Sequence, residues 1–293
     1  MNGPLDVTLR GSEKPSYLHG PVPVVVTIAN VSGTQLSIQL AYPVPEVLRF
    51  RCRNLDVGAP RPVSERTMAQ SVPIAIAPGG SHTATYYLNR YFNFKAPGRA
   101  VIDWQVVVPV KQARSPTSSL EFHGSFPIEL VTATDQQLRD ELAQYSEALH
   151  SPKRQARNEA AEALAFLDTP LSAEYVVPML GIEDLEIIGI HALGRNPSRR
   201  FDDRIVQMLS HRDSTVVGAA LEEIDRHRIN VDRSVIQHLL ASGNPNIQWL
   251  ALGWLAEHPS REDLRLLPPL VASPNQAVRE RAQSYEKSLG GVK

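Results

Sequence analysis

The sequence predicts a mixed β plus α chain, with an antiparallel β-sandwich over residues 1–134 followed by an α-solenoid of helical hairpins over residues 135–293. Three observations predict this organisation. The length of 293 residues corresponds to about two domains. Fourteen of the 23 prolines precede Asp135, together with repeated runs of valine and threonine. After that position, alanine, leucine, glutamate and arginine recur with helical spacing.

The first part contains short runs of β-branched or aromatic residues that are separated by turn residues. Glycine admits positive φ and proline fixes φ, so residues 30–33, 78–81 and 96–98 are typical of turns. Side-chain alternation places Trp104 on the inward face of its strand, where we expect it to pack between two sheets. We predict eight strands, at residues 6–9, 22–29, 36–40, 47–53, 72–76, 82–88, 100–108 and 121–130.

Two stretches of this part carry a family resemblance. They are PVPVVVTIANVSG at residues 21–33 and the Pro-Gly-Gly turn that precedes a strand ending in Tyr-Leu. With these stretches the first part resembles the immunoglobulin-like (Ig-like) sandwiches of bacterial proteins. Ala100 follows Pro-Gly-Arg at a point where such domains frequently have tyrosine, and Cys52, the single cysteine, excludes their usual intrachain disulfide.

The second part repeats with a period near 30 residues. Its helices align on five small residues with spacings of 29, 31, 31 and 31, namely Ala160, Gly189, Ala220, Ala251 and Ala282. Apolar residues stand four positions before and, in the first four repeats, four positions after these small residues. A period of this length with two apolar helical stripes indicates stacked helical hairpins. We therefore predict about four hairpins with half units at both ends.

Three hairpins have a predicted start at a capping residue followed by proline. Side-chain oxygens of Ser151, Asn244 and Ser273 can accept from backbone N–H groups that lack a partner in the first turn. Proline suits the first helical position because its missing N–H removes no helical hydrogen bond there.

The segments Arg157-x-x-Ala160-Ala161-x-Ala163-Leu164 and Val278-Arg279-x-x-Ala282 resemble HEAT repeats of the short bacterial type, which also occur in the phycobilin lyases. The resemblance covers about residues 135–289. It implies an α-solenoid in which the second helices of the hairpins form a concave wall that binds a partner.

Motifs that would indicate catalysis do not occur in the sequence. It contains no His-Glu-x-x-His, no Gly-x-Ser-x-Gly and no glycine-rich phosphate loop with its lysine. We interpret His191 as a packing residue that is either hydrogen-bonded or half-exposed, and His227 as part of a solvated turn between helices. We accordingly predict no catalytic residue, no metal ligand and no cofactor, and a protein that is not an enzyme.

The partner-binding residues that we predict fall into two groups. The first group faces outward on the second helices of the repeats and comprises Glu174, Asp203, Gln207, Ser234, His238 and Arg265. The second group is the arginine stripe Arg49, Arg51 and Arg53, which strand alternation places on one face. Its guanidinium groups can pair with carboxylates or phosphates of a partner. A solvated helical ridge and an edge-protecting strand face are the structural alternatives.

Charge and hydropathy restrict the possible partners. The formal net charge is −1, divided as +4 up to Thr134 and −5 from Asp135 onward. An acidic repeat region disfavours nucleic acid, because binding to phosphates needs clustered lysine and arginine. The longest apolar stretch, residues 22–29, is too short to cross a bilayer, so we expect no membrane insertion. The cysteine usage favours the cytoplasm, and export would require a leader that residues 1–20 do not contain.

The function that these patterns predict is a non-catalytic scaffold that binds another protein through the concave solenoid wall and through the sandwich. Two alternatives belong to other classes. One is a nucleic-acid-binding helical-repeat protein, and the other is a lyase-like enzyme of the HEAT-like superfamily. A compact pocket with a strongly perturbed acid or base would favour the enzyme.

Overall fold

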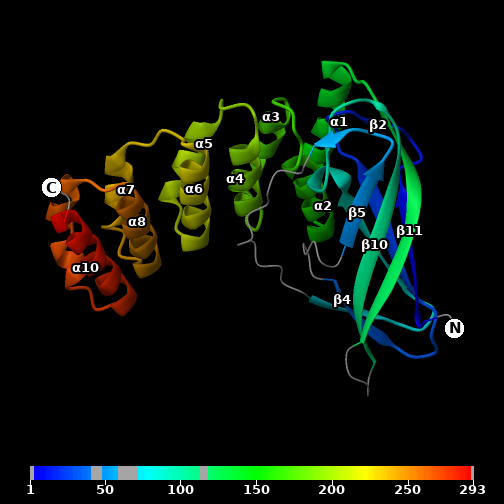
Figure 1. Cartoon of the computed structure of the whole chain (residues 1–293), viewed down its shortest axis with the longest axis horizontal. Helices are drawn as coiled ribbons and strands as arrows, with labels where there is room; N and C mark the ends of the chain where they lie inside the picture. The colour runs from blue at the N-terminus through cyan, green and yellow to red at the C-terminus, as the bar shows by residue number, and fades with distance from the viewer. Residues whose placement is uncertain (1–2, 41–47, 59–71, 113–117, 292–293) are drawn as a thin grey trace. The chain divides into compact units, whose positions relative to one another are not determined.

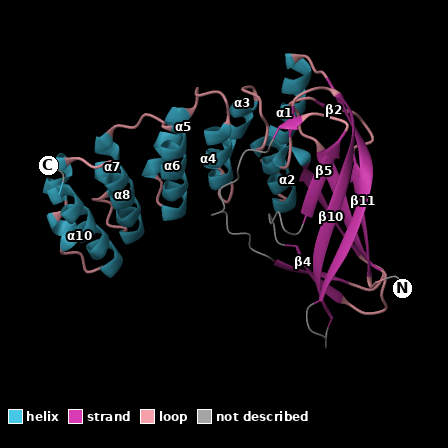
Figure 2. Cartoon of the chain, viewed as in Figure 1, coloured by secondary structure: helices cyan, strands magenta, loops and turns pink. Residues whose placement is uncertain are grey.

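The computed structural model describes residues 3–40, 48–58, 72–112 and 118–291. In these residues, antiparallel sheets precede a series of helices, which confirms the predicted order of strands and helices (Figures 1 and 2). The chain divides into two compact units, Met1–Tyr175 and Val176–Lys293. The change from strands to helices falls at Thr134, so the first unit contains both the sheets and the helices that follow them.

Two main sheets form the β part of the first unit. The first has the strand order β1-β3-β8, and both of its pairs are antiparallel. The second has the order β2-β11-β10-β4-β7, with β5 also paired to β10; only the short β2–β11 pair is parallel. The strands are β1 (Leu5–Gly11), β2 (Ser16–Tyr17), β3 (Pro23–Asn30), β4 (Leu36–Leu40), β5 (Leu48–Arg53), β6 (Val57–Gly58), β7 (Val72–Ile76), β8 (Ser81–Tyr87), β9 (Asn93–Phe94), β10 (Gly98–Gln112) and β11 (Ser118–Val131).

One hydrophobic core is shared by the two main sheets. Inward residues of β1 and β3 belong to the same cluster as inward residues of β10 and β11. The predicted alternation holds on β10, where Ile102 and Trp104 are buried and the intervening Asp103 is half-buried. Gly124, opposite Trp104 on β11, leaves room for the indole, since a Cβ there would lie 2.7 Å from the ring.

The first two helices, α1 (Asp135–Ala148) and α2 (Arg154–Ala165), pack on this β part. Helix α1 begins with a capping box, in which Thr134 and Gln137 satisfy each other's backbone N–H groups. Helix α2 contacts both α1 and β8. The contact surface is rich in polar groups, with the rings of Tyr87 and Tyr145 arranged edge to face at 6.0 Å.

A buried carboxylate lies in the same surface. Glu162 of α2 is only 6% exposed, and its Oε1 lies 3.7 Å from the guanidinium of Arg90, without a hydrogen bond. Arg90 also stacks on the ring of Phe166. Burial raises the pKa of Glu162 to about 8, and it raises the pKa of Glu141 on α1 to about 7. This contact surface therefore contains two carboxyl groups that ionise near neutral or weakly alkaline pH.

The second unit consists of helices. Helix α3 (Ser172–Val176) lies at the boundary of the two units. Helix α4 packs on α6, α6 on α8, and α8 on α10, so these four follow one another in a row (Figure 1). The elements are η2 (Val177–Gly181), α4 (Glu186–Arg195), α5 (Asp202–Gln207), η3 (Met208–Ser210), α6 (Ser214–His227), α7 (Arg233–Leu239), α8 (Pro245–Glu257), η4 (Arg261–Leu266), α9 (Pro268–Val271) and α10 (Gln276–Gly291), where η denotes a 3₁₀ helix.

The five small residues that the sequence aligns are all buried within helices. They are Ala160 on α2, Gly189 on α4, Ala220 on α6, Ala251 on α8 and Ala282 on α10. Small side chains let neighbouring elements approach closely, as at Gly189, where a Cβ would lie 2.9 Å from Met179 of η2.

Of the three predicted helix starts, only that of α8 is confirmed. The side chain of Asn244 accepts from the N–H of Asn246, and Pro245 is the first helical residue. At Ser151 and Ser273 the prediction is wrong, since Lys153 is the N-cap of α2, and Asn275, whose side chain accepts from the N–H of Val278, directly precedes α10. The helices α2 and α10 begin three residues after these serines, because the Ser-Pro pair forms the preceding turn.

Candidate partner-binding surface

Five of the predicted partner-binding residues lie in the second unit, on the elements that follow its long helices. Asp203 and Gln207 belong to α5, Ser234 and His238 to α7, and Arg265 to η4. All five are exposed. Because each pair is four residues apart on one helix, its members share a face.

Glu174 differs from these five residues. It lies on α3 within the first unit, is half-buried, and forms an ion pair with Arg139 of α1 at 3.3 Å. Its carboxylate is therefore engaged by α1.

The arginine stripe lies on β5, with all three side chains exposed. Arg53 pairs with Asp103 of the neighbouring strand β10 at 2.7 Å. An exposed ion pair of this kind contributes less than about 1 kcal/mol. Among the described residues Arg49 and Arg51 have no ion pair, so the stripe presents two unpaired cations.

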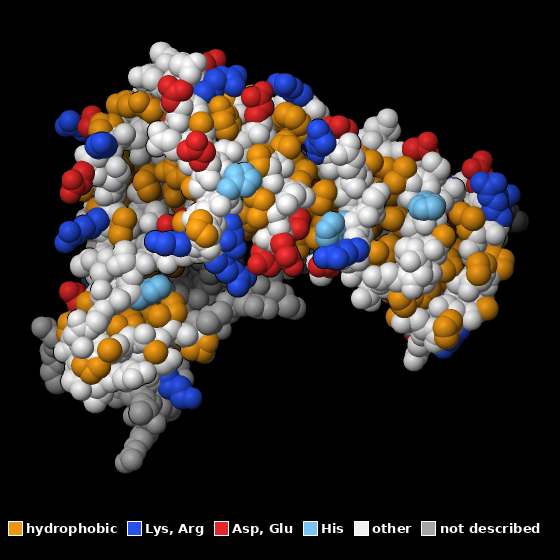
Figure 3. All heavy atoms as spheres, turned by 180° about the vertical axis from the view of Figure 1, so that it is seen from behind, with side chains coloured by type: hydrophobic (Ala, Val, Ile, Leu, Met, Phe, Trp, Pro, Cys, Tyr) orange, Lys and Arg blue, Asp and Glu red, His pale blue; other side chains and the backbone are white. Residues whose placement is uncertain are grey.

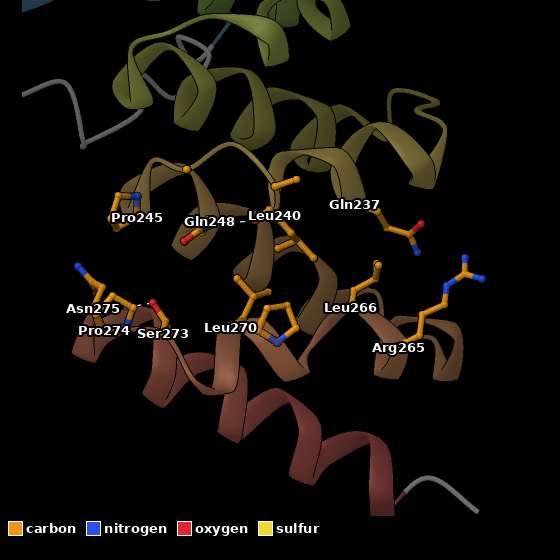
Figure 4. A pocket seen from close by; sticks show the side chains of 13 residues that line it. Gln237, Leu240, Pro245, Gln248, Arg265, Leu266, Leu270, Ser273, Pro274 and Asn275 are labelled. Carbon is orange, nitrogen blue, oxygen red and sulfur yellow. Dashed lines mark hydrogen bonds between the residues drawn. The ribbon is translucent and has the colours of Figure 1, made fainter.

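A groove brings Arg265 together with residues that the sequence analysis did not single out. It has a volume of about 510 Å³ and lies between α7, the start of α8, η4 and α9. Figure 4 shows Arg265 and Gln237 at one end, and Pro245, Pro274 and Asn275 at the other. Between these ends, Figure 4 shows the apolar side chains of Leu240, Leu266 and Leu270, and Pro269 also lines the groove.

Three side-chain amides of the groove are each held by one hydrogen bond. Gln237 Nε2 donates to Asp263 Oδ1 at 2.7 Å, and Gln248 Nε2 donates to the carbonyl of Leu240 at 3.0 Å. Asn275 Oδ1 accepts from the N–H of Val278 at 3.1 Å. These bonds fix the three amides. The side-chain oxygens of Gln237 and Gln248 and the NH₂ group of Asn275 are left to bind a ligand.

A buried carboxylate anchors the segment that carries Arg265. Asp263 on η4 is fully buried, and it accepts hydrogen bonds from Arg233 and Gln237 of α7 and from Tyr285 of α10, the last at 2.5 Å. Burial alone would raise the pKa of Asp263, but the bonds from Arg233, Tyr285 and Gln237 outweigh it and lower that pKa. The ionised carboxylate thus joins η4 to two helices.

A second buried carboxylate joins α4 and α6. Glu223 is fully buried; its Oε1 lies 2.6 Å from His191 Nδ1 and 2.7 Å from Arg226 Nη1. The interpretation of His191 as a hydrogen-bonded packing residue agrees with this contact. The interpretation of His227 is wrong, since α6 extends through this half-buried residue and its Nε2 approaches Glu223 Oε2 to 3.0 Å. The sequence around the short α6–α7 loop contains no pattern that indicates α6 continuing to residue 227.

The described residues contain no group of three or more His, Cys, Asp or Glu side chains arranged to hold a metal ion. Within the same residues, every helix is too short or too polar to cross a bilayer. On the face drawn in Figure 3, basic and acidic side chains of the described residues are interspersed.

No protein-family model matches the chain, and no curated protein sequence matches it. Among solved structures, it is similar to an engineered protein, with 19% identity over 53% of this chain and 82% of the other and a TM-score of 0.32. It is also similar to a Salmonella alpha-2-macroglobulin mutant, with 12% identity over 98% of this chain and 23% of the other and a TM-score of 0.26. To E. coli alpha-2-macroglobulin it is similar with 10% identity over 98% of this chain and 22% of the other and a TM-score of 0.24.

Proposed function

We propose that this chain is a non-enzymatic protein that binds another protein through the second elements of a HEAT-like α-solenoid, which follows an Ig-like β-sandwich. The aligned and buried small residues support the repeat. So do Arg157 and Arg279, which each stand three residues before a small residue and donate to the carbonyls of a Ser-Pro turn. The same side chain performing the same local task at both ends of the series is typical of repeated units.

The single observation that carries the binding role is the groove between α7, η4 and α9. It combines an apolar floor, fixed amides and an exposed arginine, which is the composition of a site that recognises protein segments. Asp263 and its three partners hold the groove's walls together, so the site is preformed.

The repeat surface around the groove extends the proposed interface. Asp203 and Gln207 on α5 and Ser234 and His238 on α7 supply exposed polar groups on neighbouring second elements. The −5 charge of residues 135–293 and the interspersed charges in Figure 3 favour a protein over a nucleic acid as the partner.

A pull-down with chemical cross-linking tests this function. The tagged full chain is incubated with lysate of its native host, and cross-linked peptides are mapped by mass spectrometry. We expect partner cross-links on α5, α7 and η4, and loss of capture in the double variant Asp203→Arg, Arg265→Glu. The control variant Glu286→Arg, Lys287→Glu changes two exposed residues of α10 and should retain the partner. Equal capture by both variants would contradict the proposed surface.

A further inference from the structure

We propose that the groove between α7, η4 and α9 binds an extended peptide segment of the partner in which an acidic residue adjoins an apolar one. This inference rests on the proposed protein-binding function and specifies its ligand. Three properties of the groove carry it: its charge, its hydrogen-bonding groups and its apolar floor.

The charge of the groove is positive and unbalanced. Arg265 is the only charged residue among those that line it. Its side chain is exposed and has no ion pair within the described part of the chain. Of the two acids on the same 3₁₀ helix, Asp263 is turned inward and engaged by Arg233, Gln237 and Tyr285, and Glu262 is exposed and forms no ion pair with Arg265. A carboxylate supplied by a ligand therefore finds an unneutralised guanidinium that can bind it with two hydrogen bonds.

The hydrogen-bonding groups suit a peptide backbone. The Oε1 atoms of Gln237 and Gln248 are acceptors for ligand N–H groups, and the Nδ2 of Asn275 is a donor for a ligand carbonyl. Gln237 and Asn275 stand at opposite ends of the groove in Figure 4. A ligand that reaches from one to the other needs donors and acceptors spaced along its length, as an extended peptide has them.

The apolar floor selects a side chain between these ends. Leu240 and Leu270 are buried beneath the groove, and Leu266 and Pro269 complete its walls. The proline ring has no N–H to satisfy, so this part of the lining offers surface for apolar contact only. Arg265 and Leu266 are adjacent in the chain. We therefore expect the ligand's acidic residue, which binds Arg265, and its apolar residue, which contacts Leu266, to be neighbours in sequence.

Selection from a display library of random short peptides tests the inference, with the full-length chain as bait. We expect the enriched peptides to share an aspartate or glutamate beside a leucine, isoleucine, valine, methionine or phenylalanine. The affinity of a fluorescent copy of the best peptide, measured by anisotropy, should fall by about tenfold or more in Arg265→Glu. It should fall similarly in Ala241→Trp, because Ala241 is an exposed lining residue and a larger side chain there fills the groove.

Two matched variants serve as controls. Lys287→Glu makes the same charge reversal on α10, and Ala256→Trp makes the same enlargement on an exposed position of α8 outside the groove. Both should bind the peptide as the wild type does. Circular dichroism melts will check that all four variants fold. The neutral variant Arg265→Gln should bind the peptide with an affinity between those of the wild type and Arg265→Glu.

Several results would overturn the inference: no enrichment, enriched peptides without an acidic residue, or binding that Arg265→Glu and Ala241→Trp leave unchanged. Peptide displacement by a random single-stranded DNA would make the groove a nucleic-acid site instead. Self-association in light scattering that Ala241→Trp abolishes would make a second copy of the chain the occupant. If any of these results occurs while the host partner still cross-links to α5 and α7, the proposed function stands and only the ligand assignment fails.

Discussion

Substitution of Glu162 by glutamine should change how the stability of the first unit depends on pH. Glu162 is buried between α2 and the β part, and its pKa lies at about 8 instead of 4.5 because burial disfavours the charged form. In the unfolded chain the carboxyl ionises near its ordinary pKa. Between about pH 4.5 and 8 the unfolded state therefore binds fewer protons than the folded state, so the free energy of unfolding falls as the pH rises.

The size of this effect follows from the two pKa values. At about 1.4 kcal/mol for each pKa unit, ionising the buried carboxyl costs on the order of 5 kcal/mol above pH 8. The guanidinium of Arg90, 3.7 Å away, attracts the carboxylate, so this figure is an upper bound. Glutamine resembles the protonated carboxyl in shape and does not ionise. The variant should match the wild type near pH 5 and become relatively more stable as the pH approaches 9.

Urea unfolding followed by tryptophan fluorescence measures this difference. Replacing Trp249 and Trp254 by phenylalanine leaves Trp104, in the core of the first unit, as the only tryptophan. The control is Glu147→Gln, an exposed position on α1, which should leave the pH dependence unchanged. If the wild type gains stability relative to Glu162→Gln as the pH rises, attraction by Arg90 dominates and the reasoning from burial is refuted.

Three further substitutions test the packing of the second unit by thermal and urea unfolding. Gly194→Ala places a Cβ against the buried carboxylate of Glu223 on α6 and should cost about 2–4 kcal/mol, whereas Gly181→Ala, with nothing within 4 Å, should cost much less. Ala220→Arg puts a charge at a fully buried position and should cost more than about 3 kcal/mol; an unchanged melting temperature would contradict the register of the small residues. Tyr285→Phe removes the hydrogen bond to buried Asp263 and should cost about 1.5–3 kcal/mol; wild-type stability would show that this bond contributes nothing.

Local patterns in the sequence were sufficient to predict most of the strands. The predicted strand at residues 36–40 coincides with β4, and that at residues 72–76 coincides with β7. The predictions did not include β2, β6 and β9, which have two residues each and therefore too few positions for any alternation. The predicted strand at residues 47–53 begins one residue before β5, and residue 47 lies outside the described residues.

The candidate site could be predicted only in part, because its geometry depends on contacts distant in sequence. Helical spacing was sufficient to place Arg265 on an exposed face. The local sequence does not indicate that Asp263 is buried while the neighbouring Glu262 is exposed. Its burial is decided by Arg233, 30 residues earlier, and by Tyr285, 22 residues later. The groove likewise needs Gln237 and Asn275 from separate elements, which no single window of sequence relates.

The contact between α2 and β8 gives the sheets a role in the proposed repeat array. An exposed terminal repeat needs a polar outer face, whereas a helix that is apolar all round must be covered. Helix α2 is buried at six successive residues, from 160 to 165, so it lacks such a polar face over these residues. Strand β8 packs on α2, and polar side chains also lie between the helices and the β part, where Arg90 pairs with Glu162 and the ring of Tyr87 meets that of Tyr145. In the proposed array the β part would cover this face of α2 in place of a polar cap, and the compact unit that contains the sheets accordingly includes α1 and α2.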